Sequence, residues 1–342
     1  MPELRRDPVL GRWVIIAIER ARRPSDFKPE PPAPPPDFCP FCEGNESKTP
    51  PETFAFREAG TAPDTPGWRV RVVPNKFPVL GIEGDLGKKG HGIYDMMNGI
   101  GAHEVVIETP EHETSFTPLP DDHVADIVRA YQARLLDLQR DRRMVYAMVF
   151  KNVGKAAGAS LEHTHSQIIV TPVLPRTVMQ EMSGCERFYD YRGRCLFCDI
   201  VEQELSESRV VLDRDDFVAF CPYASRFPFE TWIVPKRHES HFEKITPDEV
   251  GHFAGVLKET LLRIETAIAG GPYNFIVHTS PLDKGDIEHY HWHVEIIPRL
   301  TKVAGFEWGT GFYINPVPPE NAAEFLRDQE LDGGVKLHGE EK

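Results

Sequence analysis

The chain has 342 residues, of which 40% are hydrophobic, and a formal net charge of −14 at pH 7. This length predicts about two domains, and the acidic balance argues against a nonspecific nucleic-acid surface. No run approaches the roughly 18 apolar residues that a membrane span requires, and the first residues lack the apolar region of a signal peptide. We therefore expect a cytoplasmic protein that binds neither membranes nor nucleic acid.

The first half of the chain predicts strands and one long helix. Residues 28–37 are largely proline and predict an extended linker. Apolar positions from Val124 to Leu138 recur at helical spacing and predict an amphipathic helix over residues 121–139. Apolar runs bounded by turn residues predict strands at residues 7–17, 69–75, 103–108 and 144–150.

Cys39 and Cys42 form a Cys-x-x-Cys pair directly after the linker. In a reducing compartment such a pair indicates redox chemistry or a metal. The surrounding sequence lacks the βαβ pattern of a thioredoxin-like protein. Zinc would need two further ligands, for which the chain offers histidines, so we expect a metal site.

The residues from Gly154 to Gln167 form a Gly-, Ala- and Ser-rich loop that runs into His163 and His165. The following apolar run, residues 168–170, predicts a strand, in which positions i and i+2 share a face. Both histidines and Gln167 would then line one side. Small residues let a backbone approach a ligand and offer N–H groups to an anion. The combination predicts chemistry on phosphorus, and the alternative is a polar sheet edge with solvated histidines.

A second stretch, residues 287–294, has the same form 126 positions later, because Leu161-Glu-His-Thr-His aligns with Ile287-Glu-His-Tyr-His. The preceding features repeat as well. They are a Cys-x-x-Cys pair at residues 195–198, strands at residues 216–221, 230–234 and 273–277, and a helix at residues 246–268. We therefore expect a duplication, with an N-terminal domain at residues 1–175 and a C-terminal domain at residues 176–342.

The duplication predicts two metal sites of the same composition. In each half, a histidine that follows a strand lies 51 residues before the first histidine of the later motif. The two pairs are His112 with His163 and His238 with His289. Four protein ligands without an open position indicate a structural, tetrahedral zinc site. The eight predicted ligands, for two zinc ions per chain, are Cys39, Cys42, His112, His163, Cys195, Cys198, His238 and His289.

Other uses of the remaining histidines stay open. The second half could have lost its metal, or His278 and His293 could form a different metal site with Glu295. Four histidines stand alone in the sequence, and we interpret them as surface residues or as residues with satisfied hydrogen bonds: His103, His123, His252 and His338.

If His163 binds zinc, His165 is the free imidazole on the same strand face and the predicted nucleophile. A nucleophilic histidine needs a hydrogen bond that orients its other nitrogen. Amide, hydroxyl and backbone N–H groups nearby could hold a phosphate, and the predicted binding residues are Asn152, Gly158, Ser160 and Gln167.

The pattern Asn152-x-Gly-x-Ala-x-Gly-x-Ser-x-x-His-x-His-x-Gln167 resembles the active-site signature of the galactose-1-phosphate uridylyltransferase family, in the histidine-triad superfamily. Residues 4–16 and Cys39-Pro-Phe-Cys42 resemble the same family, so the match spans nearly the whole chain. The resemblance implies an α+β fold of two tandem histidine-triad-like domains, each an antiparallel sheet with a long helix. It also implies a homodimer.

The resemblance further implies a ping-pong transfer of UMP from UDP-glucose to galactose 1-phosphate. A histidine matching His165 attacks the α-phosphate, sugar 1-phosphate leaves, and the uridylyl-histidine passes its nucleotidyl group to a second sugar 1-phosphate. Asn152, Ser160 and Gln167 match residues that hold the phosphates. Asn75 matches a nucleoside contact.

Three features depart from the family pattern. Thr164 stands between the histidines where many members have proline, Lys76 follows Asn75 where others carry Asp, and residues 304–315 lack an expected Gln. The last segment and the second Cys-x-x-Cys pair resemble a branch that includes ADP-glucose phosphorylases. An ADP-sugar phosphorylase that uses the same histidine therefore remains an alternative. So does a zinc-stabilised nucleotide-binding protein without turnover.

The two halves differ at the loop before the paired histidines. The second half carries Asp283-Lys-Gly-Asp-Ile in place of the Gly- and Ser-rich loop. We therefore expect the second half to be structural and to cover the sugar.

Overall fold

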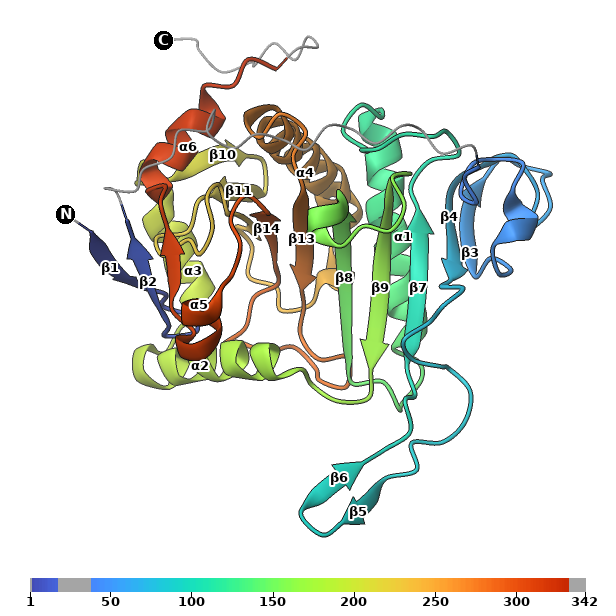
Figure 1. Ribbon diagram of the computed structural model, residues 1–342, viewed down its shortest axis with the longest axis horizontal. Coiled ribbons are helices and arrows are strands. Elements are labelled where there is room, and N and C mark those ends of the chain that lie inside the picture. Colours follow the sequence, from blue (N-terminus) through green and yellow to red (C-terminus); the bar gives the residue numbers. More distant parts are fainter. Residues whose placement is uncertain (1, 18–37, 332–342) are drawn as a thin grey trace.

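The computed structural model describes residues 2–17 and 38–331, so the predicted linker at residues 28–37 lies outside the described part. At the centre is one antiparallel sheet in the order β10-β11-β12-β14-β13-β8-β9-β7-β4-β3 (Figure 1). Its strands are β3 (Phe54–Arg57), β4 (Trp68–Pro74), β7 (Ala102–Ile107), β8 (Tyr146–Val153), β9 (His165–Thr171), β10 (Val210–Arg214), β11 (Phe217–Phe220), β12 (Thr231–Pro235), β13 (Tyr273–His278) and β14 (His293–Pro298).

The sheet has the same arrangement on both sides of its middle. β8 and β13 pair antiparallel there, with Phe150 opposite Ile276. Phe150 also pairs with Gln167 on β9, and Ile276 pairs with Glu295 on β14. The two halves of the chain are therefore related by an approximate two-fold axis at this seam, which makes β8 equivalent to β13 and β9 equivalent to β14.

An antiparallel sheet and a long helix occur in each half, as expected, but the two sheets are joined edge to edge. Pairing β8 with β13 satisfies backbone groups that would otherwise be exposed on two edge strands. One hydrophobic core contains Val128 and Ile168 from the first half and Leu261 and Val277 from the second. Sheet and core are thus continuous across the predicted boundary between residues 175 and 176.

Two long helices, α1 (Asp121–Leu138) and α4 (Pro247–Ala267), lie side by side on one face of the sheet (Figure 1). The sequence starts α4 with a capping box, in which the Thr246 side chain accepts from the Glu249 backbone and the Glu249 side chain accepts from the Thr246 backbone. These bonds satisfy N–H groups that a first helical turn leaves free. The apolar sides of both helices join the core with strand residues such as Val106 and Ile296.

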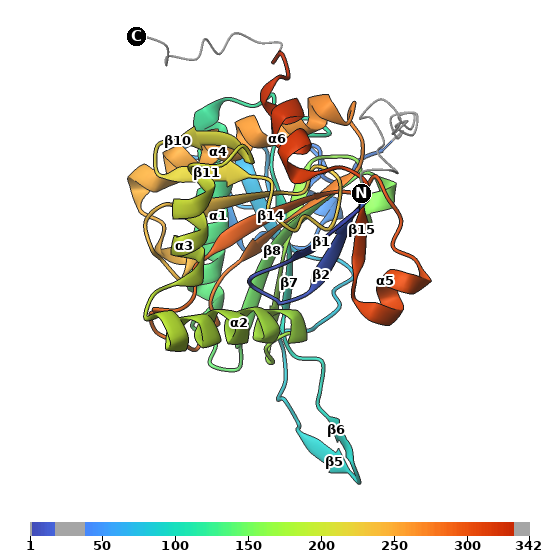
Figure 2. The same cartoon turned by 90° about the vertical axis from the view of Figure 1, so that its left-hand side faces the viewer.

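In the second half the opposite face of the sheet is covered as well. Helices α2 (Arg176–Arg192) and α3 (Leu196–Glu204) pack there on β11 and β12, through residues that include Phe197, Val218 and Trp232. Beside them lies a small sheet in the order β1-β2-β15 (Figure 2). Its strands are β1 (Glu3–Arg6), β2 (Trp13–Ile16) and β15 (Tyr313–Asn315).

The remaining elements are short. They are the hairpin strands β5 (Lys89–His91) and β6 (Tyr94–Met96), the helices α5 (Gly305–Thr310) and α6 (Pro319–Arg327), and the 3-10 turns η3 (Glu46–Lys48), η4 (Lys155–Ala157) and η5 (Phe242–Lys244). The β5–β6 hairpin projects away from the large sheet (Figures 1 and 2). In the part of the chain that the structure describes, no helix combines the length and the apolar character needed to cross a membrane.

Candidate active site and metal centres

Strand β9 begins at His165 and turns alternate side chains to the two faces of the sheet. Ser166 and Ile168 face α1, because Ser166 Oγ lies 2.6 Å from the hydroxyl of Tyr131 and Ile168 belongs to the core. His165 and Gln167 therefore lie on the opposite face, as the strand pattern predicts. There, His165 lines a cavity of about 400 Å³.

The cavity is bounded by the loop of residues 154–160, called the Gly-rich loop below, and by the second half of the chain. Asn152, at the end of β8, lines the cavity together with residues of the loop. The loop turns at Gly154, whose φ angle of +79° disfavours other residue types. A Cβ atom on Gly154 would lie 2.9 Å from Pro272, so glycine also permits close contact with the second half.

Of the predicted phosphate-binding residues, one lines the cavity with His165 and the other three lie beside it in the loop or on the strand. Asn152 lines the cavity, and Gly158 is its neighbour, because a Cβ atom on Gly158 would be 3.7 Å from Asn152 Nδ2. Ser160 belongs to the same loop, and Gln167 lies two residues beyond His165 on the same strand face. The structure thus places Asn152 in the same cavity as His165, with the Gly-rich loop at its edge.

Polar side chains connect Gln167 to the predicted nucleoside contact. His103, on β7, has its Nε2 atom 2.8 Å from Gln167 Oε1 and 3.1 Å from Asn75 Nδ2. His103 is 8% exposed, so it is a buried residue with hydrogen-bond partners rather than a surface residue. Of the other isolated histidines, His123 is hydrogen-bonded to a backbone carbonyl and His252 to a carboxylate. His338 lies outside the described residues.

The ring of His165 is oriented for attack through Nε2. Its Nδ1 lies 2.7 Å from the carbonyl oxygen of His163 and must donate, because a carbonyl oxygen only accepts. The tautomer is thereby fixed, and the lone pair is on Nε2. Burial lowers the pKa of His165, so the ring is neutral at pH 7.

A buried ion pair supports the chain segment that carries His165. Lys151 Nζ lies 2.5 Å from the Glu108 carboxylate, 2.7 Å from the Thr164 hydroxyl and 3.1 Å from the His165 carbonyl oxygen. Burial alone would raise the pKa of Glu108, but Lys151 and the hydroxyls of Ser166 and Thr164 hold it below its usual range. Thr164, between the two histidines, thus contributes a hydroxyl that proline could not supply.

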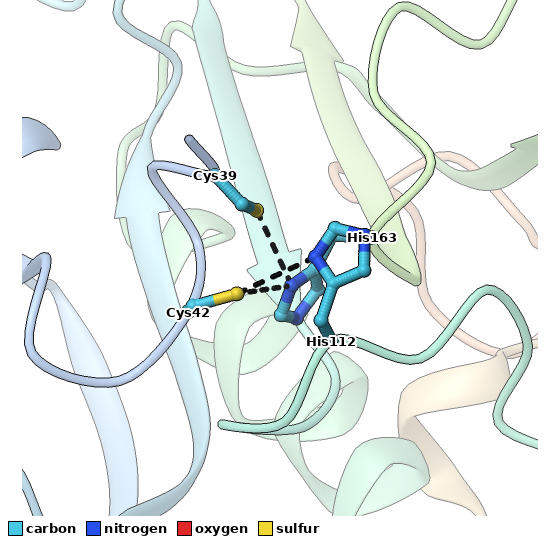
Figure 3. A group of neighbouring side chains, drawn as sticks. All are labelled: Cys39, Cys42, His112 and His163. Carbon is cyan, nitrogen blue, oxygen red and sulfur yellow. Dashed lines mark hydrogen bonds between the residues drawn. The ribbon is translucent and has the colours of Figure 1, made fainter. Parts of the chain in front are cut away.

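The first predicted group of metal ligands converges in the structure (Figure 3). Cys39 Sγ lies 3.5 Å from His163 Nδ1, and Cys42 Sγ lies 3.4 Å from His112 Nδ1 and 3.6 Å from His163 Nδ1. Zinc bonds of the usual lengths to sulfur and nitrogen place tetrahedral S and N ligands about 3.6 Å apart. The four side chains therefore fit a tetrahedral ion of this kind.

The protonation of this group also suits a cation. Burial lowers the pKa of His163 to about 4, so its imidazole is neutral, as a metal ligand must be. Burial, together with the neighbouring Cys39, raises the pKa of Cys42 to about 11, because two thiolates side by side repel each other. A divalent ion would offset that repulsion. His163 Nε2 donates to the carbonyl of Thr109 at 2.9 Å, which leaves Nδ1 for the metal.

The second group of possible ligands contains Cys195, Cys198 and His238 as predicted, but its fourth member is His291 and not His289. Cys198 Sγ lies 3.5 Å from His238 Nδ1 and 3.7 Å from His291 Nδ1. His289 faces Cys195 only through its backbone carbonyl, 3.9 Å from the sulfur. The assignment of His289 as a metal ligand is therefore wrong.

The error comes from a two-residue difference between the repeats. The strand register makes His165 equivalent to His293, and hence His163 equivalent to His291. His238 and His291 are 53 residues apart, against 51 for the equivalent pair in the first half. A shift of two residues keeps the same strand face, so alternation could not reveal it.

Helix α2 covers the second-half equivalent of His165. The Nδ1 of His293, like that of His165, is bonded to the carbonyl two residues earlier. Glu181, on α2, lies 3.2 Å from His293 Nε2 and 3.1 Å from His278 Nδ1. Burial alone would lower the pKa of His278, but Glu181 and Glu295 raise it to about 10. The Glu181 carboxylate therefore contacts Nε2 of His293, the nitrogen that faces the cavity in the equivalent residue His165.

Glu181, His278 and His293 are close enough to hold a metal ion. The alternative site suggested by the sequence combines these histidines with Glu295 instead. Glu295 lies 2.6 Å from Arg226 and 3.6 Å from His278 Nε2. The carboxylate nearest to the rings of His278 and His293 is thus that of Glu181, and no spacing in the sequence indicated Glu181 as a ligand.

Known proteins resemble this chain along nearly all of its length. Residues 1–175 match the family model described as galactose-1-phosphate uridyl transferase, N-terminal domain, and residues 108–332 match a domain of unknown function. The chain is 38% identical to an ADP-glucose phosphorylase of Arabidopsis thaliana, over 96% of this chain and 93% of that protein. It is 31% identical to a galactose-1-phosphate uridylyltransferase of Thermotoga maritima, over 97% of this chain and 100% of that protein.

Solved structures show the same fold. A crystal structure of an Arabidopsis thaliana ADP-glucose phosphorylase with bound ADP-glucose superposes with a TM-score of 0.83 at 37% identity, over 97% of this chain and 100% of that one. A uridylyltransferase structure superposes with a TM-score of 0.74 at 30% identity, over 96% of this chain and 97% of that one. Both likenesses extend across the predicted boundary between the two halves.

Proposed function

Because the chain belongs to the galactose-1-phosphate uridyl transferase family, we propose that it transfers a nucleotidyl group from a nucleotide sugar through His165. One observation carries this proposal. His165 lines the cavity, and its Nδ1 is held by the His163 carbonyl, so Nε2 is the free nucleophilic nitrogen. The surrounding amides and the Gly-rich loop match the needs of a phosphate that gains negative charge in the transition state.

The reaction runs in two half-reactions. Nε2 of His165 attacks the α-phosphorus of the nucleotide sugar, the P–N bond forms, and the sugar 1-phosphate leaves with the electrons of the broken P–O bond. The substituted ring is a cation, which the bond from Nδ1–H to His163 stabilises. An oxygen of the acceptor phosphate then attacks the same phosphorus and restores neutral His165. Asn152 and Gln167 donate N–H groups to the phosphate oxygens in both steps.

We propose UMP as the transferred group, with UDP-glucose as donor and galactose 1-phosphate as acceptor. The family model and the Thermotoga maritima relative support this assignment. A second candidate is the transfer of AMP from an ADP-sugar to phosphate through the same histidine. The higher identity to the Arabidopsis thaliana ADP-glucose phosphorylase favours this candidate.

We further propose that residues 1–175 carry the chemistry and that residues 176–342 serve mainly as support. The covered His293 in the second half supports this division of labour. We assign zinc to the two Cys2His2 groups because their donor set and spacing fit it. The homodimer and the cytoplasmic location stay predictions from the resemblance and the composition.

The function is tested by the mass of the intact protein after separate incubation with UDP-glucose and ADP-glucose. A uridylyl adduct is expected, and it should be absent from the His165→Gly variant, which keeps its fold and metal content. An adenylyl adduct alone would move the assignment to the second candidate. No adduct with either nucleotide sugar would contradict transfer and favour a binding protein without turnover.

A further inference from the structure

Two side-chain amides, those of Asn152 and Gln167, are expected to donate N–H groups to phosphate. An amide does so only if its NH2 group, and not its oxygen, faces the ligand. We propose that Asn274 and His103 are positioning residues that hold these amides by their oxygen atoms and so turn the N–H groups to the phosphate. This inference rests on the proposed nucleotidyl transfer.

Asn274 lies opposite Asn152 across the seam between β13 and β8. Its Nδ2 is 2.8 Å from the carbonyl oxygen of Ala157 and 2.8 Å from Asn152 Oδ1. A carbonyl oxygen only accepts, so the atom of Asn274 that faces Ala157 must be the nitrogen. The second N–H of that group points at Asn152, which must therefore present its oxygen. The NH2 group of Asn152 is left beside Gly158 in the Gly-rich loop.

His103 fixes Gln167 by the same logic. The backbone N–H of Val79 donates to His103 Nδ1 over 3.3 Å, so Nδ1 has no proton and Nε2 carries one. Nε2–H then donates to the atom of Gln167 that lies 2.8 Å away, which must be Oε1.

Asn75 Nδ2, at 3.1 Å from the same Nε2 of His103, would favour the other tautomer. The Nε2–H tautomer leaves Nδ1 free to accept from the backbone N–H of Val79, whereas the alternative would set that N–H against a ring N–H. We therefore assign the proton to Nε2. The NH2 group of Gln167 is then free on the strand face that carries His165.

The two contacts have one consequence for the reaction. An amide rotated by half a turn would place a partly negative oxygen against the phosphate and would oppose the charge that develops there. Neither Asn274 nor His103 needs to touch the substrate, because each acts through the amide that it orients. Asn274 belongs to the second half, so that half contributes to the phosphate site across the seam.

The variant Asn274→Leu tests the first contact, because leucine is similar in size but donates no hydrogen bond. Rapid mixing with saturating nucleotide sugar, followed by mass analysis, gives the rate constant of nucleotidyl-enzyme formation. We expect this rate constant to fall about tenfold to a hundredfold. This loss is at most as large as the loss caused by removing an oxyanion donor altogether. His103→Phe should lower the same rate constant. The substrate concentration that gives half the maximal rate should change less than the rate constant does.

Gln132, on α1, provides a matched control. Its Nε2 also donates to two acceptors, the carbonyls of Glu243 and Ile245 at 2.9 and 2.8 Å, but on the face of the sheet away from His165. Gln132→Leu should lower the melting temperature about as much as Asn274→Leu and leave the rate constant unchanged. Equal rate losses in these two variants would mean that the effect is structural and would overturn the proposal.

Double variants show whether each residue acts through its amide. In an Asn152→Ala background, Asn274→Leu should cause little further loss, because the amide that it orients is gone. The same holds for His103→Phe in a Gln167→Ala background. Losses that multiply in both backgrounds would contradict the inference. A wild-type protein that forms no adduct would contradict the proposed function itself, and this inference with it.

Discussion

In the proposed transfer, two neighbours prepare His165 for attack in different ways. The carbonyl of His163 holds Nδ1 and fixes the tautomer. Lys151 holds the carbonyl of His165 itself and is paired with Glu108, so the backbone on which the imidazole stands is anchored inside the protein. Ring and backbone are thus both oriented before a nucleotide sugar binds, which is the condition for attack on phosphorus along a defined line.

The rate of nucleotidyl-enzyme formation should depend on pH through His165. Protonation of Nε2 removes the attacking lone pair, and the pKa of this residue is lowered by burial. The midpoint of the decline in the rate constant should therefore lie below about pH 6.5, the usual histidine value. Mass analysis after rapid mixing at each pH measures this. A midpoint at or above pH 6.5, in protein shown by circular dichroism to be folded, would contradict the prediction.

Strand alternation predicts some residues of the site and cannot predict others. His165 and Gln167 follow from a period of two, and the structure places both on β9, whereas His163 lies in a bend just before the strand. His103 and Asn274, the proposed positioning residues, contact residues 64 and 122 positions away in the chain. Their partners are set by the pairing of strands from different parts of the sequence, and no local spacing encodes that pairing.

At the scale of elements, the two halves differ in what lies against equivalent strands. Beside β9 there is an open cavity and a Gly-rich loop, whereas beside β14 there is α2 with Glu181. His293 stacks on His278 with ring centroids 4.6 Å apart and is 1% exposed. The same imidazole position is therefore accessible in one repeat and enclosed in the other.

We predict that His293→Gln leaves nucleotidyl-adduct formation intact, whereas His165→Gln abolishes it. The first substitution keeps a side chain of similar size but loses the contact with Glu181, so the free energy of unfolding should fall by about 1–3 kcal/mol. Mass analysis and urea unfolding on the same samples provide both measurements. Loss of the adduct in a folded His293→Gln protein would show that the second repeat takes part directly in the chemistry.

Most elements of the large sheet and both long helices could be predicted from apolar periodicity. The expected helix at residues 121–139 is α1, at Asp121–Leu138, and the expected helix at residues 246–268 is α4, at Pro247–Ala267. Helix α2 was not predicted, because it is mostly polar and only four of its residues are buried, with Glu181 among them. A helix that covers a polar histidine cluster lacks the apolar stripe on which such predictions depend.

At the scale of the molecule, the two Cys2His2 groups connect distant segments. The first joins Cys39 to His163, two residues before β9, and the second joins α3 to the loops around β12 and β14. A metal that closes long loops restricts the unfolded chain, so its binding energy becomes folding energy. Both groups should therefore contribute to stability more than to catalysis.

The metal content separates the two assignments of the fourth ligand in the second group. The wild-type protein and His289→Ala should each contain two metal ions per chain, one for each Cys2His2 group, and His291→Ala should contain one. His291→Ala should also melt at a lower temperature, whereas His289→Ala should not. Elemental analysis of the purified proteins measures the first property and calorimetry the second. A loss of metal in His289→Ala alone would restore the assignment made from spacing.

The seam between β8 and β13 places Phe150 opposite Ile276, its own counterpart in the other repeat. This is the arrangement that two identical subunits adopt around a two-fold axis. In a homodimer, every substitution appears on both sides of such an axis. In a single chain the two sides are encoded separately, so each can change without the other. That independence allows one imidazole to keep its cavity while its counterpart is enclosed, and it allows Asn274 in one repeat to orient an amide in the other.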